Sequence, residues 1–474
     1  MNPLDNADTA FTVEVLGEET EYTGPQEIDL KADDIQLNSP KSRGGAVRVR
    51  SLNGEQLSVV AYSEEFVSSD SFKVLPCIRQ PNDGYEYYAV SVIQSRIEFQ
   101  FSGDISVVLP PEGRSAIVIV TTEDNTVLEI TLTQDVFVGD ANDLMEQISG
   151  DVIRAGEPVT ITLPRAMQTL YLASNDDMTG SRIVSNRPIS FVSGHECGTL
   201  PNTLLYCDQM VDQIPPTSTW GRTFIVASLA TRVSNDTIKI VASRNETTIN
   251  VLCAISQSSN LFISDAGGFM ETTLLSGDSC YFESNNPILL VQFSRSSLSD
   301  EVFDSDPFMV VIPPVEQYRS NYVIRTFPTS DPNSPPGVHY INVLIPGTYD
   351  PSQVLLDGEP LVETSFQTIF CDDFESTCAF TLQLPITETT HTLSHANPSA
   401  RLNAVVYWFA FRVGQGYFAG MMQQPIACKM CHVSCMILSL SLSLSLSLSL
   451  SLSLSLTHTH THSLSLCMYS YLTF

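Results

Sequence analysis

Positively charged residues are scarce in this sequence. Lysine and arginine number 23 in 474 residues, against 53 aspartates and glutamates, which gives a formal net charge of −30. A chain with this charge is repelled by nucleic acids and by anionic membrane surfaces, and it attracts cations or basic partners. We therefore exclude nucleic-acid binding.

Charged residues of either sign are also few, at 16% of the sequence, whereas hydrophobic residues make up 43%. The hydrophobic content is ample for packed cores, so the chain is not disordered. Serine, threonine, asparagine and proline recur throughout, which favours short strands and polar turns over amphipathic helices. We predict an all-β fold with predominantly antiparallel sheets and very little helix.

Signatures of common enzymes are missing. The sequence contains no G-x-S-x-G, no P-loop, no dinucleotide-binding fingerprint and no H-E-x-x-H. Its start, MNPLDNADTAFTVEV, contains neither the basic nor the apolar segment of a signal peptide. Because the rest of the chain has extracellular character, we expect a truncated N-terminus.

The end of the chain has low complexity. Serine and leucine alternate over residues 438–456, and threonine and histidine alternate over 457–462. Repeated TC and AC dinucleotides encode these alternations, so we interpret residues 428–474 as a disordered tail or as non-coding repeat read through as protein. The uncharged run at 436–456 is long enough to span a bilayer, but it is so rich in serine that we expect no membrane insertion.

Two segments of the chain repeat one another. Residues 116–131, AIVIVTTEDNTVLEIT, align without a gap to residues 237–252, TIKIVASRNETTINVL. Each contains an alternating β-branched run, a polar turn and a second alternating run, which predicts a β-hairpin. A looser third copy covers residues 340–361.

A second element also repeats, as DQMVDQIPPTSTWGRTFIV at 208–226 and DPFMVVIPPVEQYRSNYVI at 306–324. The repeat length of roughly 100–130 residues exceeds a propeller blade of about 45 residues and suits whole sandwich-like units. We predict tandem β-sandwich-like modules, with a propeller-like arrangement of the repeats as the alternative. The expected modules are a truncated first at 1–90, a second at 91–223, a third at 224–321 and a divergent fourth at 322–427.

The segment that links the repeats has a distinctive combination of residues. It reads GHEC…YCDQMVDQIPPTSTWGRTFIVASLATR…NDTIKIVASRNETTINV and joins two cysteines, a Pro-Pro pair and Trp220 over more than 50 positions. This combination strongly resembles the N-terminal region of the IgGFc-binding protein family, and weaker similarity extends over about residues 45–420. The resemblance implies a secreted, adhesive or mucus-associated protein. Immunoglobulin Fc binding gives that family its name.

Eleven cysteines occur in a chain of extracellular character, a setting that favours disulfides. The first expected pair closes a short loop that contains glycine, proline and asparagine, and another brackets the segment CDDFESTC. The expected pairs are Cys197–Cys207, Cys253–Cys280 and Cys371–Cys378, which leaves Cys77 over.

The GHEC segment also permits a hydrolase site, in which His195 activates a Cys197 thiolate beside Glu196. We favour the structural disulfide, because a secreted setting oxidises Cys197 with Cys207. We predict no catalytic residues and no enzyme activity.

Metal sites are a further alternative. The acidic clusters at Asp33-Asp34, 175–177 and Asp372-Asp373 resemble oxygen-rich calcium loops, although none has EF-hand spacing. A calcium-dependent, lectin-like module is therefore the alternative to a protein-binding one. Residues 428–435 contain C-x2-C-H-x2-C, the spacing of half a zinc site, and no second ligand pair follows. We predict no metal or other cofactor, with calcium as the open alternative.

Three residues are candidate surface features. Asn235 and Asn245 begin glycosylation sequons in predicted turns. Trp220 is either an exposed partner contact or a core residue at a module junction. We favour the core position, because Tyr318 recurs at the same place in the next copy.

These features together predict a non-enzymatic, extracellular binding or adhesion protein. Its partners would be proteins or glycoproteins in mucus, in matrix or at a cell surface. Turns and surfaces between modules would supply the contacts, because the strands are committed to cores.

Overall fold

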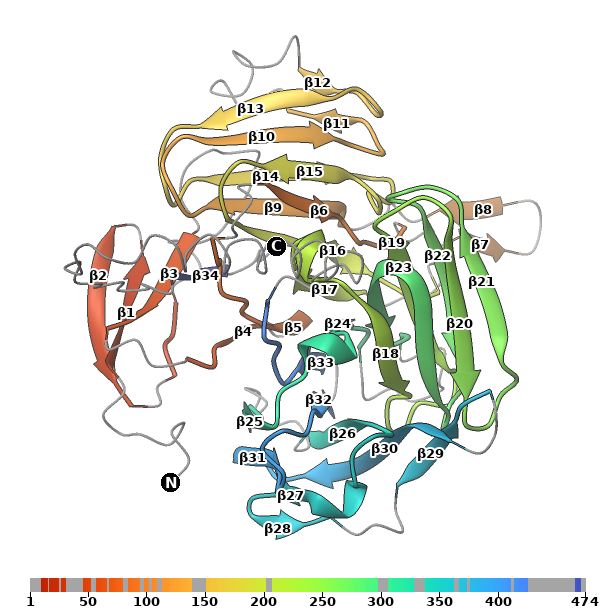
Figure 1. The fold of residues 1–474 in the computed structure, drawn as a ribbon. Coiled ribbons are helices and arrows are strands. Elements are labelled where there is room, and N and C mark those ends of the chain that lie inside the picture. The colour runs from red at the N-terminus through yellow and green to blue at the C-terminus, as the bar shows by residue number, and fades with distance from the viewer. Residues whose placement is uncertain are drawn as a thin grey trace, which may run out of the picture.

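The computed structural model is built from antiparallel strands (Figure 1), which confirms the all-β expectation. Among the described residues, the helical turns are the short 3-10 segments η2 (Thr217–Thr219), η3 (Val315–Gln317) and η4 (Pro351–Gln353). That part of the chain contains no helix with the length and apolarity of a membrane span. The structure describes residues 10–15, 17–24, 27–30, 46–52, 57–65, 68–79, 84–93, 98–101, 105–108, 113–138, 151–201, 207–296, 306–327, 337–361, 366–372, 376–410, 413–424 and 465–469.

The N-terminal strands form a small sheet of order β2-β1-β3-β34 and a hairpin of β4 and β5. Valines on β1 and β3 pack against Val118 and Val120 of the neighbouring sheet. The bounds are β1 (Ala10–Val15), β2 (Glu18–Thr23), β3 (Ala46–Ser51), β4 (Val60–Glu65), β5 (Ser68–Lys73) and β34 (Ser465–Tyr469).

The next strands form two four-stranded sheets, of order β13-β10-β15-β6 and β14-β9-β16-β17. Ile117 and Ile119 of one sheet share a core with Leu128 and Ile130 of the other. Two further hairpins, β7–β8 and β11–β12, accompany them. The bounds are β6 (Tyr85–Tyr88), β7 (Glu98–Phe101), β8 (Ile105–Val108), β9 (Ser115–Thr121), β10 (Thr126–Thr131), β11 (Val136–Phe137), β12 (Val152–Ile153), β13 (Val159–Leu163), β14 (Thr169–Ser174), β15 (Arg182–Ser185), β16 (Ile189–Gly198) and β17 (Asp208–Gln213).

Strands β18 to β24 repeat this strand order. The 15-residue strand β23 pairs through its first half with β18 and β20, and through its second half with β19 and β24. The two halves therefore have the orders β21-β20-β23-β18 and β22-β19-β23-β24. The bounds are β18 (Gly221–Ala227), β19 (Asp236–Ala242), β20 (Thr247–Cys253), β21 (Ser259–Ile263), β22 (Phe269–Leu274), β23 (Ser279–Phe293) and β24 (Met309–Ile312).

The C-terminal sheets follow the same plan for a third time, with the orders β28-β27-β31-β25 and β29-β30-β26-β32-β33. The bounds are β25 (Asn321–Arg325), β26 (Val338–Pro346), β27 (Val354–Leu356), β28 (Glu359–Pro360), β29 (Gln367–Phe370), β30 (Thr377–Ile386), β31 (Thr390–His395), β32 (Asn403–Ala410) and β33 (Val413–Phe418). The recurring order agrees with tandem sandwich-like modules. The module boundaries stay predictions. β6 lies in the range expected for the first module, but it pairs with β15, which lies in the range expected for the second.

The hairpin prediction for the repeated segments is wrong. β9 and β10 are consecutive strands, but they lie in different sheets, and neither pairs with the other. β26 and β27 behave in the same way. β19 and β20 do not pair with each other either, although both pair with β23 within one seven-stranded sheet. Both edges of each strand are already paired with other strands, so the polar turn carries the chain to a second sheet or, after β19, to the other half of the sheet that contains β23.

The four sets of strands surround a common centre (Figure 1). Each set contributes one strand to it: β5 lies against both β17 and β33, and β24 also lies against both β17 and β33. Gly414 of β33 approaches Asp306 so closely that a side-chain carbon there would overlap the Asp306 carbonyl oxygen. The contact between β5 and β33 closes the assembly into a ring, which we call the central ring of β5, β17, β24 and β33.

Buried carboxylates join neighbouring strands of the central ring. Asp70 of β5 accepts a hydrogen bond of 2.6 Å from the backbone N–H of Val211 on β17. Asp212 of β17 accepts one of 2.7 Å from the N–H of Val311 on β24. Burial raises the pKa of Asp212 to about 8, although its hydrogen bonds lower it, and burial also raises the pKa of Asp70.

A buried ion pair joins the second and third sets of strands. The Lys239 side chain on β19 is 1% exposed, and its Nζ lies 2.9 Å from Asp177 Oδ2 and 3.0 Å from Glu271 Oε1. The same Nζ donates to the carbonyl oxygen of Ser91 at 2.6 Å and lies 4.8 Å from the centre of the Phe269 ring. Lys239 therefore anchors its strand to a loop of the preceding sheets.

The central ring predicts a pH dependence. Because the folded-state pKa of Asp212 lies above its ordinary value of 3.8, its contribution to stability falls as the pH rises from 3.8 to about 8. Asn at this position does not ionise. The stability of the Asp212→Asn variant relative to the unmodified chain should therefore increase between about pH 5 and about pH 7, by up to ~1.4 kcal/mol per pH unit.

Urea denaturation at the two pH values measures this change. The exposed Asp176 offers a control, since Asp176→Asn removes a carboxylate that lies in solvent. The contradicting result is a difference in the free energy of unfolding, between the Asp212→Asn variant and the unmodified chain, that is the same at both pH values. That result would show that Asp212 is already ionised in the folded ring.

The ion pair of Lys239 predicts a loss of stability. Lys239→Met leaves the partly buried Asp177 carboxylate without its cation, so it should lower the free energy of unfolding by about 3 kcal/mol. Arg154→Met removes an exposed pair with Asp135, whose side chains are 61% and 52% exposed, and should cost less than about 1 kcal/mol. Equal losses in the two variants, measured by urea denaturation, would contradict the role of Lys239 as an anchor.

Candidate binding surface

The GHEC segment lies at the end of β16, where a bulge between His195 and Gly198 shifts the pairing with β17. His195 is fully buried, and its Nδ1 accepts a hydrogen bond of 3.1 Å from the backbone N–H of Cys197. Burial lowers the pKa of His195 to about 4, against the opposing influence of Asp177. The imidazole is therefore neutral near pH 7, and its Nδ1 holds the local turn.

Glu196 takes part in a separate buried contact. Its carboxylate pairs with Arg114, whose Nε and Nη2 donate at 3.2 and 3.1 Å, and it accepts a hydrogen bond from the Tyr171 hydroxyl. Burial raises the pKa of Glu196, while Arg114 lowers it. Glu196 and His195 thus serve different contacts and do not converge on a common point.

Cys197 is joined to Cys207, with Cα atoms 4.9 Å apart. A disulfide sulfur is no thiolate, so Cys197 in this structure is not the nucleophile that the hydrolase alternative requires. The segment is a closed loop fixed by a disulfide, a buried imidazole and an ion pair.

The other cysteines form two further bonds. Cys253 and Cys280 are direct cross-strand partners on β20 and β23, and Cys371 bonds to Cys378 across the β29–β30 turn. Cys77 lies outside these three pairs and is partly buried. Among the described residues, the group of possible metal ligands is Cys253, Asp278 and Cys280, and its two sulfurs are disulfide-bonded.

The calcium alternative finds little support in the described acidic clusters. Asp177 faces the ammonium group of Lys239, and Asp372 accepts a hydrogen bond of 3.1 Å from Asn250. A lysine cation beside a carboxylate opposes a second cation at the same place. Asp33, Asp34 and Asp373 lie outside the described residues, as does the cysteine-histidine cluster at 428–435.

Trp220 is a core residue, so its reading as an exposed partner contact is wrong. It is 2% exposed, its indole N–H donates to the carbonyl oxygen of Pro215 at 2.9 Å, and its ring packs near Tyr88. Tyr318 follows η3 as Trp220 follows η2, and it is fully buried. A repeated aromatic at this turn fills the space where successive sets of strands meet.

The two sequon asparagines flank β19. Asn245 is exposed in the β19–β20 turn and accepts a hydrogen bond of 2.9 Å from the backbone of Ala266. Asn235 is partly buried and accepts one of 2.9 Å from the backbone of Ser276. Glycosylation at these residues stays a prediction.

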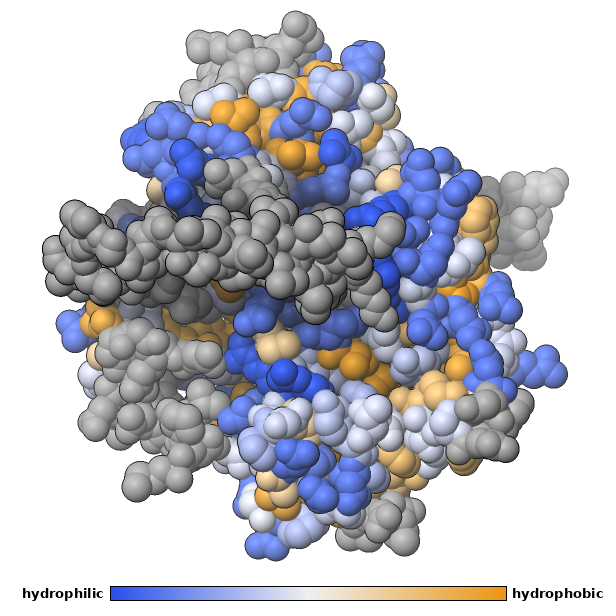
Figure 2. Space-filling model, viewed as in Figure 1, coloured by the Kyte–Doolittle hydropathy of each residue, from blue (hydrophilic) through white to orange (hydrophobic). Residues whose placement is uncertain are grey.

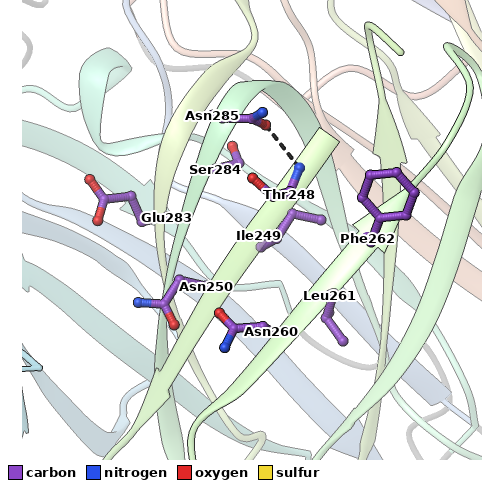
Figure 3. Close-up of a pocket in the computed structure, with 9 residues that line it drawn as sticks. All are labelled: Thr248, Ile249, Asn250, Asn260, Leu261, Phe262, Glu283, Ser284 and Asn285. Atoms are coloured by element: carbon purple, nitrogen blue, oxygen red, sulfur yellow. Dashed lines mark hydrogen bonds between the residues drawn. The ribbon is translucent and has the colours of Figure 1, made fainter. Parts of the chain in front are cut away.

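Most of the surface in the orientation of Figure 2 is polar, with apolar side chains in small separate patches. An open groove of about 570 Å³ lies on the outer face of β20, β21 and β23 (Figure 3). We call it the β20–β21–β23 groove. It is lined by Thr248, Ile249, Asn250, Asn260, Leu261, Phe262, Glu283, Ser284 and Asn285.

Strand register explains how the groove forms. Asn250 stands opposite Asn260 on one side and opposite Glu283 on the other, so the three side chains form a row across the strands. Thr248 and Phe262 form the next row, and the backbone N–H of Thr248 donates to Asn285 at 2.9 Å. Sequence reasoning did not single out this groove, because polar residues at alternate positions are also typical of an ordinary solvent-facing strand.

Comparison with known proteins identifies the family of the chain. The profile of the family described as IgGFc binding protein matches residues 71–407, which include β6 to β31. The human IgGFc-binding protein is 29% identical to this chain over 180 residues. This match covers 38% of the chain and 3% of the length of the human protein. The chain therefore belongs to the IgGFc-binding protein family.

Proposed function

We propose that this chain is a non-enzymatic binding or adhesion region of an extracellular protein. Its partners would be proteins or glycoproteins in mucus, in matrix or at a cell surface. The observation that carries the proposal is the family match over residues 71–407, because this stretch includes β17 and β24 of the central ring in full and the second half of β5. The human relative's name states that it binds the Fc part of immunoglobulin G, and this activity is one case of the proposed class.

The disulfides support an extracellular location. Three bonded pairs occur at sequence separations of 10, 27 and 7 residues. Such bonds persist in oxidising compartments and are rare in the cytosol. Two of them close short segments of chain, and the Cys253–Cys280 bond joins two paired strands beside the core.

The design of the GHEC loop supports binding over catalysis. The cysteine is bonded, the histidine is neutral and buried, and the glutamate is paired with Arg114. Rigid loops on a sheet scaffold lower the entropy that association costs, because they are ordered before the partner arrives.

Binding to purified extracellular glycoproteins tests the proposal. The full chain, produced under oxidising conditions and immobilised, should bind at least one of mucin, a matrix glycoprotein and immunoglobulin G with a Kd of about 1 μM or tighter, and serum albumin much more weakly. Because Asp177 already pairs with the ammonium group of Lys239, a calcium chelator should leave binding unchanged.

The matched control is the same chain after reduction and alkylation of its cysteines, which should bind less because its loops are released. Surface plasmon resonance measures both forms. Absence of binding by the oxidised chain to every member of the panel would overturn the proposal.

A further inference from the structure

The β20–β21–β23 groove contains polar groups that the protein leaves available. Among the described residues, the side chains of Glu283 and Asn260 make no hydrogen bond or ion pair with the rest of the protein. Asn250 donates through its Nδ2 to Asp372, so its Oδ1 stays available as an acceptor. Figure 3 shows Asn250 and Asn260 side by side on adjacent strands. The row across the groove therefore presents acceptor oxygens to solvent.

A second carboxylate adjoins this row. Asp372 follows β29, and its Oδ2 lies 3.1 Å from the amide nitrogen of Asn250, so this carboxylate stands at the rim of the groove. The adjacent Cys371 is bonded to Cys378, and the Cys253–Cys280 bond ties β20 to β23. Both walls of this end are thus covalently restrained.

The charge of the groove favours a cationic occupant. Glu283 lines it, Asp372 stands at its rim, and none of the nine lining residues is lysine or arginine. The whole chain has a net charge of −30, which attracts basic partners over longer distances. These two carboxylates, each beside Asn250, complement an ammonium or guanidinium group.

The other end of the groove is apolar. Phe262 is 56% exposed, and Leu261 beside it is partly exposed. The methylene stem of a lysine or arginine packs well on such a surface while its charged end reaches a polar group. An aromatic face also attracts a cation directly.

We propose that the β20–β21–β23 groove binds an extended segment of an extracellular protein that carries lysine or arginine. The inference rests on the proposed function and adds the chemistry of the partner. Neighbouring strands are about 4.8 Å apart, so the row from Asn260 to Glu283 spans about 10 Å, the length of three extended residues. The segment crosses the strands, with one basic side chain between Glu283 and Asp372 and a neighbouring side chain on Phe262.

Binding of a labelled peptide tests the groove. The probe is a short fluorescent peptide of alternating lysine and threonine, and its counterpart has glutamate in place of lysine. Fluorescence anisotropy at about 0.15 M salt measures affinity under conditions that screen long-range attraction. The full chain should bind the lysine peptide and should not bind the glutamate peptide.

The decisive variant is Glu283→Gln with Asp372→Asn, which removes both charges and keeps the shapes of the side chains. It should weaken binding of the lysine peptide about tenfold or more, because hydrogen bonds to charged groups are lost. Glu18→Gln with Glu21→Gln on the exposed strand β2 removes the same charge elsewhere and should leave the affinity within about twofold.

Three outcomes overturn the groove proposal. The first is an equal loss of affinity for the lysine peptide in both double variants, which would show that the net charge alone attracts the peptide. The second is unchanged affinity in the groove variant. The third is displacement of the lysine peptide by a neutral oligosaccharide mixture at lower concentration, which assigns the groove to a glycan. Binding of the groove variant to the glycoproteins of the panel would support the proposed function even if the groove proposal failed. Failure of the groove proposal and failure of the proposed function are therefore distinguishable.

Discussion

The central contact of β5, β17, β24 and β33 is the constraint on which the rest of the structure depends. Each strand comes from a different set of sheets, so the ring brings together residues more than 300 positions apart in sequence. Buried Asp70 and Asp212 bond to the backbone of the next strand, and neither carboxylate has solvent to replace that partner. The polar centre specifies which strands meet, while the apolar cores on either side supply most of the stabilisation.

The local pattern predicted the strands but not their partners. Alternation at 116–131 and 237–252 correctly indicated two strands in each copy, and the recurrence of Trp220 and Tyr318 correctly indicated a repeated core aromatic. Pairing depends on which strand edges the other sheets occupy, and alternation contains no information about that. In the same way, DQMVDQ resembles a half-exposed strand, yet all of its residues are buried, because the neighbouring sheets cover both of its faces.

The candidate surface was only partly accessible to sequence reasoning. The three cysteine pairs follow from short spacings and from an oxidising setting, and the structure brings these same cysteines together. The GHEC segment attracts attention because its residue types are reactive, but burial and bonding engage each of them locally. The β20–β21–β23 groove has the opposite character: its residues are common, and only their register across three strands places Asn260, Asn250 and Glu283 in one row.

Hydrogen exchange followed by mass spectrometry tests the closure of the ring most directly. The account predicts that peptides containing β5 and β33 exchange as slowly as those containing β17 and β24, because one cooperative opening exposes all four strands. It also predicts that all four are slower than the exposed strand β2. Fast and independent exchange of β5, with β17 and β24 still protected, would contradict a closed ring and would reduce the structure to a row of separate modules.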